Sequence, residues 1–463
     1  STSRGLGDVY KRQYWRSFLF LKSIIATFDA GIMDENVLNK LKILAESAKY
    51  DVSCSSSGTV RSGKAGMLGN TVGGWGICHS FAEDGRCISL LKVMLTNYCI
   101  YDCAYCINRR SNDLPRATLS VAELVDLTME FYRRNYIEGL FLSSGVVRNP
   151  DYTMERLVRV AKDLRTIHRF NGYIHLKSIP GASRELVNEA GLYADRLSVN
   201  VEIPKEENLK LLAPEKDHKS VYAPMRYIQQ GVLESSEERK KHRHAPRFAP
   251  AGQSTQMIVG ATAETDKDIL YLSSALYKGP TMRRVYYSGY ISVNTYDKRL
   301  PALKQPPLVR ENRLYQADWL LRFYQFKVDE IVDDSYPDLD LEIDPKLSWA
   351  LRHPEQFPVD INKADYEMLL RVPGVGVKSA KLIVASRRFS RLGFYELKKI
   401  LKELDRSGTR FEILYLESSD DVLIKRYKET RRFHPLSGKD GRVEEGIKEE
   451  RKRLEFLRER ADY

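Results

Sequence analysis

Three closely spaced cysteines are the residues best suited to carry chemistry in this sequence. Cys99, Cys103 and Cys106 stand within eight positions, in the run LLKVMLTNYCIYDCAYCINRR. The apolar stretch Leu90–Leu95 directly precedes them, so we predict a loop at the carboxyl end of a β-strand, where an α/β barrel carries its functional groups. Three thiolates can bind three irons of a [4Fe–4S] cluster and leave the fourth iron open to another ligand.

Zinc binding and disulfide formation are the alternative uses of these thiols. A structural zinc site takes a fourth Cys or His at short spacing, usually in paired CxxC knuckles. The six cysteines stand at 54, 78, 87, 99, 103 and 106, so no further thiol follows the cluster. Disulfides are typical of cysteine-rich secreted chains, and six cysteines are few for 463 residues. Thiols kept for a metal predict a reducing, cytoplasmic compartment.

The spacing CxxxCxxC, with the aromatic Tyr105 before the last cysteine, resembles the signature of the radical S-adenosylmethionine (SAM) superfamily. The resemblance implies an α/β fold, a partial (β/α)6 barrel, with a [4Fe–4S] cluster bound by Cys99, Cys103 and Cys106. It implies that S-adenosyl-L-methionine chelates the fourth iron and is cleaved reductively to a 5′-deoxyadenosyl radical. It also implies an electron donor such as flavodoxin or ferredoxin.

The region from residue 90 to about 330 alternates β-prone runs with amphipathic ones, which predicts parallel strands joined by helical crossovers. The six predicted strands are Leu90–Leu95, Gly139–Ser143, Tyr173–Ser178, Arg196–Glu202, Gln256–Ala261 and Val285–Val293. The stretch Ser120–Asn135 is a predicted helix, with Ser120 as its N-cap and Glu123 completing a capping box. The basic, proline-bearing stretch Asn208–Pro250 is predicted to be a lid or a substrate loop.

Candidate SAM ligands follow these strands, because barrels bind ligands at the carboxyl ends of their strands. The triplet Ser143-Ser144-Gly145 stands where the superfamily usually has a Gly-Gly-Glu-like turn, although the acidic residue is missing. Alternation along the fourth strand would put Asn200 and Glu202 on one face. The run from Gly260 to Thr265 resembles the superfamily's glycine-containing turn beside adenine. The predicted cofactor-binding residues are Tyr105, Ser143, Ser144, Gly145, Lys177, Asn200, Glu202, Gly260 and Thr262. No catalytic residue is identified.

The three upstream cysteines leave two interpretations open. Cys54 lies in DVSCSSSG, and Cys78 and Cys87 flank the run GICHSFAEDGRC, in which His79 is adjacent. They are either ligands of an auxiliary cluster or metal, or small buried thiols in an N-terminal cap that folds over the barrel mouth.

A second motif lies in FPVDINKADYEMLLRVPGVGVKSAKLIVASRR, residues 357–388, and resembles a helix-hairpin-helix. Gly374 and Gly376 let the backbone approach a phosphate, and free N–H groups at the start of the second helix point at the anion. Lys378 and Ser379 add donors. Such modules bind the nucleic-acid backbone without reading bases. The alternative is a helical hairpin that packs on the barrel or binds a protein.

The overall charge agrees with an anionic partner. The formal net charge is +12 and the pI about 9.2. The densest basic run is Arg239–His244, RKKHRH, which is either a nucleic-acid contact or a solvated loop. No apolar run reaches the ~18 residues that a membrane span needs, so we expect no membrane partner.

Both ends of the chain look foreign to its middle. Residues 1–13, STSRGLGDVYKRQ, resemble translated adapter sequence, and Met33 opens a predicted amphipathic helix. Arg410–Tyr463 resembles an internal piece of the RapZ-type nucleotide-binding proteins (RNase adapters), with a predicted strand Phe411–Leu416 and helix Asp421–Glu429. That family's phosphate loop, GxxxxGK[ST], does not occur in this chain. We expect a gene chimera; the alternative is a natural fusion.

The stretch Met33–Leu397 resembles radical SAM proteins associated with DNA modification or repair. The predicted organisation is a non-native leader (1–32), an N-terminal cap (33–89), a radical SAM barrel (90–335), a helix-hairpin-helix module (336–400) and a RapZ-like fragment (401–463). The resemblance implies a radical SAM enzyme acting on nucleic acid. The alternatives are a small-molecule or peptide substrate, or a non-catalytic iron–sulfur protein that binds nucleic acid.

Overall fold

The computed structural model describes residues 34–48, 77–81, 87–393, 420, 424 and 442–459. These residues form two compact units. The first contains the described residues up to Asp318 together with Val332–Leu341, and the second contains Trp319–Ile331 and the described residues from Glu342 onward. Within the described ranges, no helix is long and apolar enough to cross a bilayer.

The first unit is built on one seven-stranded sheet whose strand order is the order of the sequence. Its strands are β1 (Ile77–Phe81), β2 (Cys87–Met94), β3 (Gly139–Ser143), β4 (Tyr173–Lys177), β5 (Arg196–Ser198), β6 (Gln253–Val259) and β7 (Met282–Gly289). β1 pairs antiparallel with β2, and the five pairings from β2 to β7 are all parallel. Six parallel strands in sequential order confirm the predicted partial (β/α)6 barrel.

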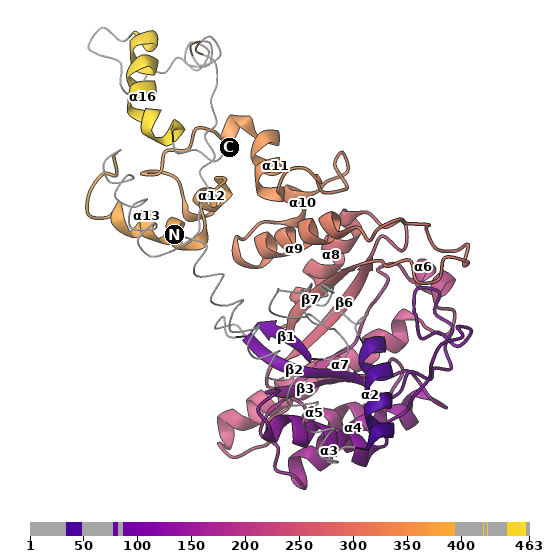
Figure 1. Cartoon of the computed structure of the whole chain (residues 1–463). Helices are drawn as coiled ribbons and strands as arrows, with labels where there is room; N and C mark the ends of the chain where they lie inside the picture. Colours follow the sequence, from indigo (N-terminus) through magenta and orange to yellow (C-terminus); the bar gives the residue numbers. More distant parts are fainter. Residues whose placement is uncertain are drawn as a thin grey trace, which may run out of the picture. The chain divides into compact units, whose positions relative to one another are not determined.

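Helices connect the parallel strands. The helices of this unit are α2 (Glu35–Ala48), α3 (Val121–Arg133), α4 (Pro150–Thr166), α5 (Arg184–Tyr193), α6 (Glu206–Leu212), α7 (His218–Lys241), α8 (Asp266–Tyr277) and most of α9 (Leu308–Phe323). Figure 1 shows α3, α4 and α5 side by side along the sheet, in agreement with their mutual contacts. Helices on the sheet explain why β3 is buried at all five positions and carries an almost continuous apolar run.

The two local helix predictions are confirmed. α3 begins with a capping box, in which Ser120 accepts from the Glu123 N–H at 3.1 Å and Glu123 accepts from the Ser120 N–H at 2.7 Å. α2 covers the predicted N-terminal helix, and its residues Leu38, Leu41 and Leu44 are buried. Both predictions depend on contacts within one or two helical turns.

Two other predictions are wrong. The fourth strand, β5, ends at Ser198 and does not reach Glu202, whose φ of +65° lies in the left-handed region. The stretch Asn208–Pro250 is not a loop, because most of it forms α6 and α7. The basic run 239–244 begins at the end of α7 and leads toward the amino end of β6, away from the carboxyl ends that carry the cysteine loop.

The second unit is helical in its described part. It contains the end of α9, then α10 (Val328–Ile331), α11 (Pro345–Arg352), the 3-10 helix η1 (Pro354–Gln356), α12 (Tyr366–Arg371), α13 (Val377–Ser386) and α16 (Val443–Arg458). α12 and α13 pack around a small core of Leu369, Leu370, Ala380, Ile383 and Leu392. Cys54, the predicted strand Phe411–Leu416 and, apart from Ile424, the predicted helix Asp421–Glu429 lie outside the described residues.

Candidate functional site

The cysteine loop leaves the sheet directly after β2 and is fixed where it begins. The Leu95 N–H donates to the Ser143 carbonyl at 2.8 Å, which joins the ends of β2 and β3. The buried Asn97 side chain donates to the Pro115 carbonyl at 2.9 Å and accepts from the Ala117 N–H at 2.8 Å. The thiols that follow therefore start from a well-defined backbone position.

The three thiols lie on this loop without a disulfide between them. Cys103 is buried, Cys99 and Cys106 are half-buried, and all are free thiols. The Val146 N–H, from the segment after β3, donates to the Cys99 sulfur at 3.4 Å. Among the residues that the structure describes, no three His, Cys, Asp or Glu side chains converge as ligands of a single metal ion. A [4Fe–4S] cluster takes one thiolate at each of three irons, so its ligands need not converge on one point.

The pKa values of the thiols bear on whether Cys99, Cys103 and Cys106 can act as thiolate ligands of a cluster. Burial raises the pKa of Cys103 to about 11 and that of Cys106 to about 12, and repulsion between the neighbouring thiolates adds to both. Three thiolates in this place therefore need compensating positive charge. Iron supplies such charge and binds the deprotonated thiol, so the donor set fits a cluster.

A segment far along the chain holds the loop in shape. Asn294, buried after β7, donates from Nδ2 to the Ala104 carbonyl at 2.6 Å and to the Cys106 carbonyl at 3.0 Å. Arg109 forms ion pairs with Asp102 at 2.5 Å and with Asp297 at 2.7 Å. The sequence analysis missed Asn294, Arg109 and Asp297. Of these three residues only Arg109 is close to the cysteines in the sequence, three residues after Cys106, so only its position could have indicated a role in the loop.

The predicted turn after β3 lies against the cysteine loop. The Gly145 N–H donates to the Thr96 carbonyl at 2.8 Å, and a Cβ at Gly145 would lie 2.2 Å from the Tyr98 carbonyl oxygen. This close approach requires glycine. The Ser144 hydroxyl donates to the Gly145 carbonyl at 2.7 Å, whereas the buried Ser143 hydroxyl has no hydrogen-bond partner among the described residues.

The Glu202 carboxylate is paired with two side chains of this chain. The Tyr105 hydroxyl donates to its carboxylate, and Lys216 Nζ lies 2.8 Å from the same oxygen. The side chains of Lys216 and Glu202 are only 12% and 14% exposed. Burial would raise the pKa of Glu202, but Lys216 and Lys177 outweigh it and hold that pKa below its usual value. No local pattern around Lys216 indicated this contact, because it forms between segments that are distant in the sequence from Tyr105.

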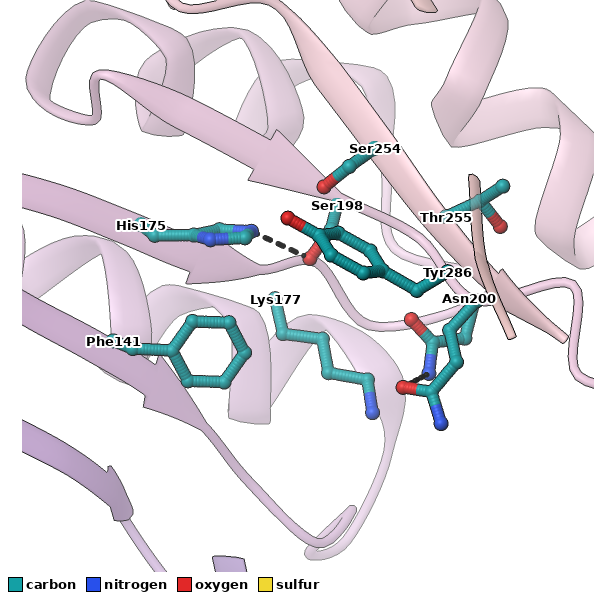
Figure 2. Close-up of a pocket in the computed structure, with 9 residues that line it drawn as sticks. Phe141, His175, Lys177, Ser198, Asn200, Ser254, Thr255 and Tyr286 are labelled. Atoms are coloured by element: carbon teal, nitrogen blue, oxygen red, sulfur yellow. Dashed lines mark hydrogen bonds between the residues drawn. The ribbon is translucent and has the colours of Figure 1, made fainter. Parts of the chain in front are cut away.

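Asn200 and Glu202 are both close to Lys177, which lines a pocket with Asn200 and lowers the pKa of Glu202. The pocket is small and lies inside the barrel, and Asn200 Nδ2 donates to Gln256 Oε1 at 3.2 Å. His175 Nε2 lies 2.9 Å from the Ser198 hydroxyl oxygen at the same pocket (Figure 2). The lining residues are Phe141, His175, Lys177, Ser198, Asn200, Ser254, Thr255, Gln256 and Tyr286.

The composition of this pocket limits its ligands. The lining residues come from β3 to β7 and, for Asn200, from the segment just after β5, and the side chains of His175, Ser198 and Lys177 gather in one place (Figure 2). They include a lysine, two amides and several hydroxyls but no carboxylate, and the buried Ser254 hydroxyl has no hydrogen-bond partner among the described residues. The cavity has little more room than a water molecule, so any group that enters it must be small.

The predicted glycine turn follows β6. Gly260 has φ of +84°, which an L side chain rarely adopts. The Thr262 hydroxyl donates to Glu264, and that carboxylate also accepts from Asn208 Nδ2 at 2.8 Å. Gly260 therefore stands at the carboxyl end of the barrel, while Thr262 is already engaged within the turn.

The hairpin between α12 and α13 lies in the second unit. Gly374 is exposed with φ of +81°, and Gly376 is the N-cap of α13 without a side-chain cap. The first bond within the helix runs from the Ala380 N–H to the Gly376 carbonyl at 2.8 Å, so the earlier N–H groups, including those of Lys378 and Ser379, have no partner within the helix. The Lys378 side chain is exposed.

Family models match two parts of the chain. The radical SAM superfamily matches residues 93–235. The RapZ-like N-terminal domain matches residues 376–463. The second match begins at the N-cap of α13, so it starts before the predicted Arg410 and includes the second hairpin helix.

Curated relatives match a short part of the chain. A "Nucleotide-binding protein" of Lachnoclostridium phytofermentans is 59% identical over 68 residues, 15% of this chain and 24% of the relative. A protein of the same name from Ruminiclostridium cellulolyticum is 51% identical over 69 residues, 15% of this chain and 23% of the relative. The chain thus spans about a quarter of the length of these relatives.

Solved structures with partial similarity include three enzymes or maturases. The hydrogenase maturase HydG from Carboxydothermus hydrogenoformans has a TM-score of 0.38 at 14% identity, covering 50% of this chain and 49% of its own. Coproporphyrinogen III oxidase (HemN) from Escherichia coli has a TM-score of 0.31 at 13% identity, covering 48% and 50%. The cobalamin-dependent enzyme OxsB has a TM-score of 0.30 at 12% identity, covering 82% and 60%.

Proposed function

We propose that this chain, which carries a radical SAM domain and is an enzyme of the kind that uses a [4Fe–4S] cluster and SAM, acts on nucleic acid. The observation that carries the proposal is the glycine hairpin at Gly374–Gly376, which begins α13 in the same chain as the radical SAM domain. We further propose DNA modification or repair as the biological role. An electron donor such as flavodoxin or ferredoxin would complete the system.

The proposed roles at the cluster follow from the contacts of the loop. Cys99, Cys103 and Cys106 would hold three irons, and the Val146 N–H stabilises charge on the Cys99 sulfur. When bound, the cluster and SAM supply a radical that abstracts a hydrogen atom from the substrate. Gly145 lets the turn after β3 lie against the loop.

The proposed nucleic-acid contact is a phosphate at the start of α13. The N–H groups of Lys378 and Ser379 have no partner within the helix, and the helix dipole adds positive potential there. The exposed side chains of Lys378 and Lys381 supply cations on the same module. Contacts to phosphate hold the nucleic acid in place without reading its sequence.

The reacting nucleotide would approach the cysteine loop at the carboxyl ends of the strands. A base inside a duplex cannot reach a buried radical, so it must leave the stack. The small pocket among Lys177, Asn200 and His175 has little more room than a water molecule, so the base would stay outside it.

The first experiment tests the radical activity and its substrate. The full chain is reconstituted with iron and sulfide under anaerobic conditions, reduced with dithionite and supplied with SAM and deuterated DNA. The expected result is 5′-deoxyadenosine that carries deuterium from the DNA. Cleavage of SAM without label transfer, while a deuterated small molecule or peptide does transfer label, would reject nucleic acid as the substrate.

The second experiment tests the hairpin by fluorescence anisotropy with labelled DNA. Gly376→Ala suits this test because the added Cβ would meet only the Tyr324 hydroxyl, at 3.4 Å, so the fold should persist while the phosphate approach is obstructed. Gly376→Ala and Lys378→Ala should weaken binding, and Lys378→Ala should also reduce its salt dependence. Lys363→Ala, an exposed lysine of the same module, is the matched control. Unchanged binding by both variants would reject the hairpin assignment.

A further inference from the structure

Two aromatic side chains stand together on the surface of the second unit. Trp319 and Phe323 lie one turn apart at the end of α9, with ring centroids 4.3 Å apart and an interplanar angle of 46°. Their side chains remain 49% and 42% exposed. We call these two residues the aromatic pair. Two large rings half in water within one patch are typical of an interaction surface.

Tyr324 connects the aromatic pair to the hairpin. Tyr324 directly follows Phe323, and its hydroxyl lies 3.4 Å from the place that a Cβ at Gly376, the N-cap of α13, would take. The Tyr324 ring also packs against the hairpin core. The aromatic pair is therefore adjacent to the start of α13, where the phosphate contact is proposed.

The surroundings of the pair are basic. The Arg322 guanidinium lies 4.9 Å from the centroid of the Phe323 ring. Lys378 is exposed in the turn of α13 that contacts Tyr324. The patch thus combines flat aromatic faces with cations, the combination that binds the bases and backbone of a single strand.

We propose that the aromatic pair stacks an unpaired nucleobase beside the phosphate held at the start of α13, so that this unit prefers single-stranded or locally unpaired nucleic acid. The inference rests on the proposed function and specifies its substrate. Every base has a π-face, so stacking tolerates any sequence. In a duplex the faces of the bases are covered by their neighbours. A preference for unpaired bases matches a reaction that needs a base outside the stack.

The test measures the affinity of the full chain for a labelled oligothymidine and for a duplex of equal length, at one fixed salt concentration. Trp319→Ala should weaken single-strand binding about tenfold and leave duplex binding unchanged, because only the unpaired base stacks. Trp319→Phe should retain most of the affinity. Leu351→Ala, a 55% exposed apolar residue of the same unit, is the matched control.

A spectroscopic readout covers the case in which Trp319→Ala does not fold. The chain has four tryptophans, and stacking of a base on Trp319 should quench part of their fluorescence. Oligothymidine should quench the wild-type protein, and Trp319→Phe should lose that quenching. Equal quenching in both proteins would overturn the stacking proposal.

The outcomes separate this proposal from the hairpin assignment. Gly376→Ala and Lys378→Ala should weaken single-strand and duplex binding together, since both ligands carry phosphate. If those variants bind normally and Trp319→Ala loses only the single strand, the hairpin assignment fails and the stacking site stands. If Trp319→Ala changes neither ligand, or both equally, the stacking proposal is overturned.

Discussion

Asn294 donates a hydrogen bond from its side-chain amide to the Cys106 carbonyl at 3.0 Å, across 188 positions of sequence. The same nitrogen donates to the Ala104 carbonyl at 2.6 Å, and the amide oxygen accepts from Asn112 Nδ2 at 2.8 Å. The segment after the last strand thus fixes the backbone between the second and third cysteines. This contact shapes the cysteine loop in the protein itself, before any cofactor binds.

Replacing Asn294 by alanine should loosen the loop. The buried Ala104 carbonyl would lose its side-chain donor, at a cost of about 1–3 kcal/mol, while the Cys106 carbonyl would keep only the Arg109 N–H at 3.3 Å. The expected results are faster alkylation of the thiols in the apo-protein and less iron retained after reconstitution. Asn362→Ala, which removes a similar amide contact to the Leu392 carbonyl in the hairpin unit, should change neither value. Equal alkylation rates in wild type and Asn294→Ala would show that the hydrogen bonds from Asn294 do not hold the cysteine loop in place.

Gly145→Ala should disturb the same loop from its other side. The new Cβ would lie 2.2 Å from the Tyr98 carbonyl oxygen, a backbone atom that can move only with the loop. We expect a stability loss of about 1–3 kcal/mol and reduced iron binding, measured by denaturation and iron analysis. The control is Gly279→Ala, whose Cβ would meet the Leu276 carbonyl at 3.2 Å. A variant at position 145 as stable as this control would rule out the close approach.

The local features of the fold could be predicted from the sequence because they depend on neighbouring residues. The Ser120–Glu123 capping box and the strand Gly139–Ser143 are such cases. The course of the chain after β5 could not be predicted by alternation, because Glu202 adopts a left-handed conformation. Its N–H donates to the Gln256 carbonyl at 2.9 Å, a contact with another strand that no local pattern encodes.

Some residues of the candidate site could likewise be predicted from the sequence, and others could not. The thiols could be recognised because their spacing is local, and Lys177 because it lies next to the end of a predicted strand. Lys216 and Asn294 could not, since their contacts with Glu202 and Cys106 form only when distant segments meet. His175 and Ser198 are buried within strands. The residues that flank them in the sequence are those of an ordinary amphipathic strand, so they gave no indication of a pocket. Their pairing depends on the parallel register of β4 and β5.

The ion pair between Lys216 and Glu202 should show the behaviour of a buried pair. Lys216→Met leaves the Glu202 carboxylate without its cation and should cost about 3–5 kcal/mol in the free energy of unfolding. The double variant Lys216→Met/Glu202→Gln should recover part of this loss, because no charge remains. Lys162→Met, in the exposed Lys162–Glu189 pair, should cost less than about 1 kcal/mol. A double variant less stable than Lys216→Met would refute the argument.

Lys346 supports the hairpin turn from inside the second unit. Its Nζ donates to the Val375 carbonyl at 2.6 Å and lies 4.9 Å from the centroid of the Tyr324 ring. Burial lowers the pKa of Lys346 to about 7, although Asp344 acts in the opposite direction. In the unfolded chain the same amine keeps its usual, higher pKa, so unfolding takes up a proton between these two values.

The stability of the second unit should therefore rise with pH from about 7 toward about 10, by at most about 1.4 kcal/mol per pH unit, because the unfolded state binds the extra proton in this window. Below pH 7 both states are protonated and this contribution is constant. Urea denaturation of the full chain at several pH values would measure the slope. Lys346→Met should remove this part of the slope, whereas Lys363→Met, at an exposed lysine, should retain it. Identical slopes in wild type and Lys346→Met would show that Lys346 is not neutral in the folded protein at high pH.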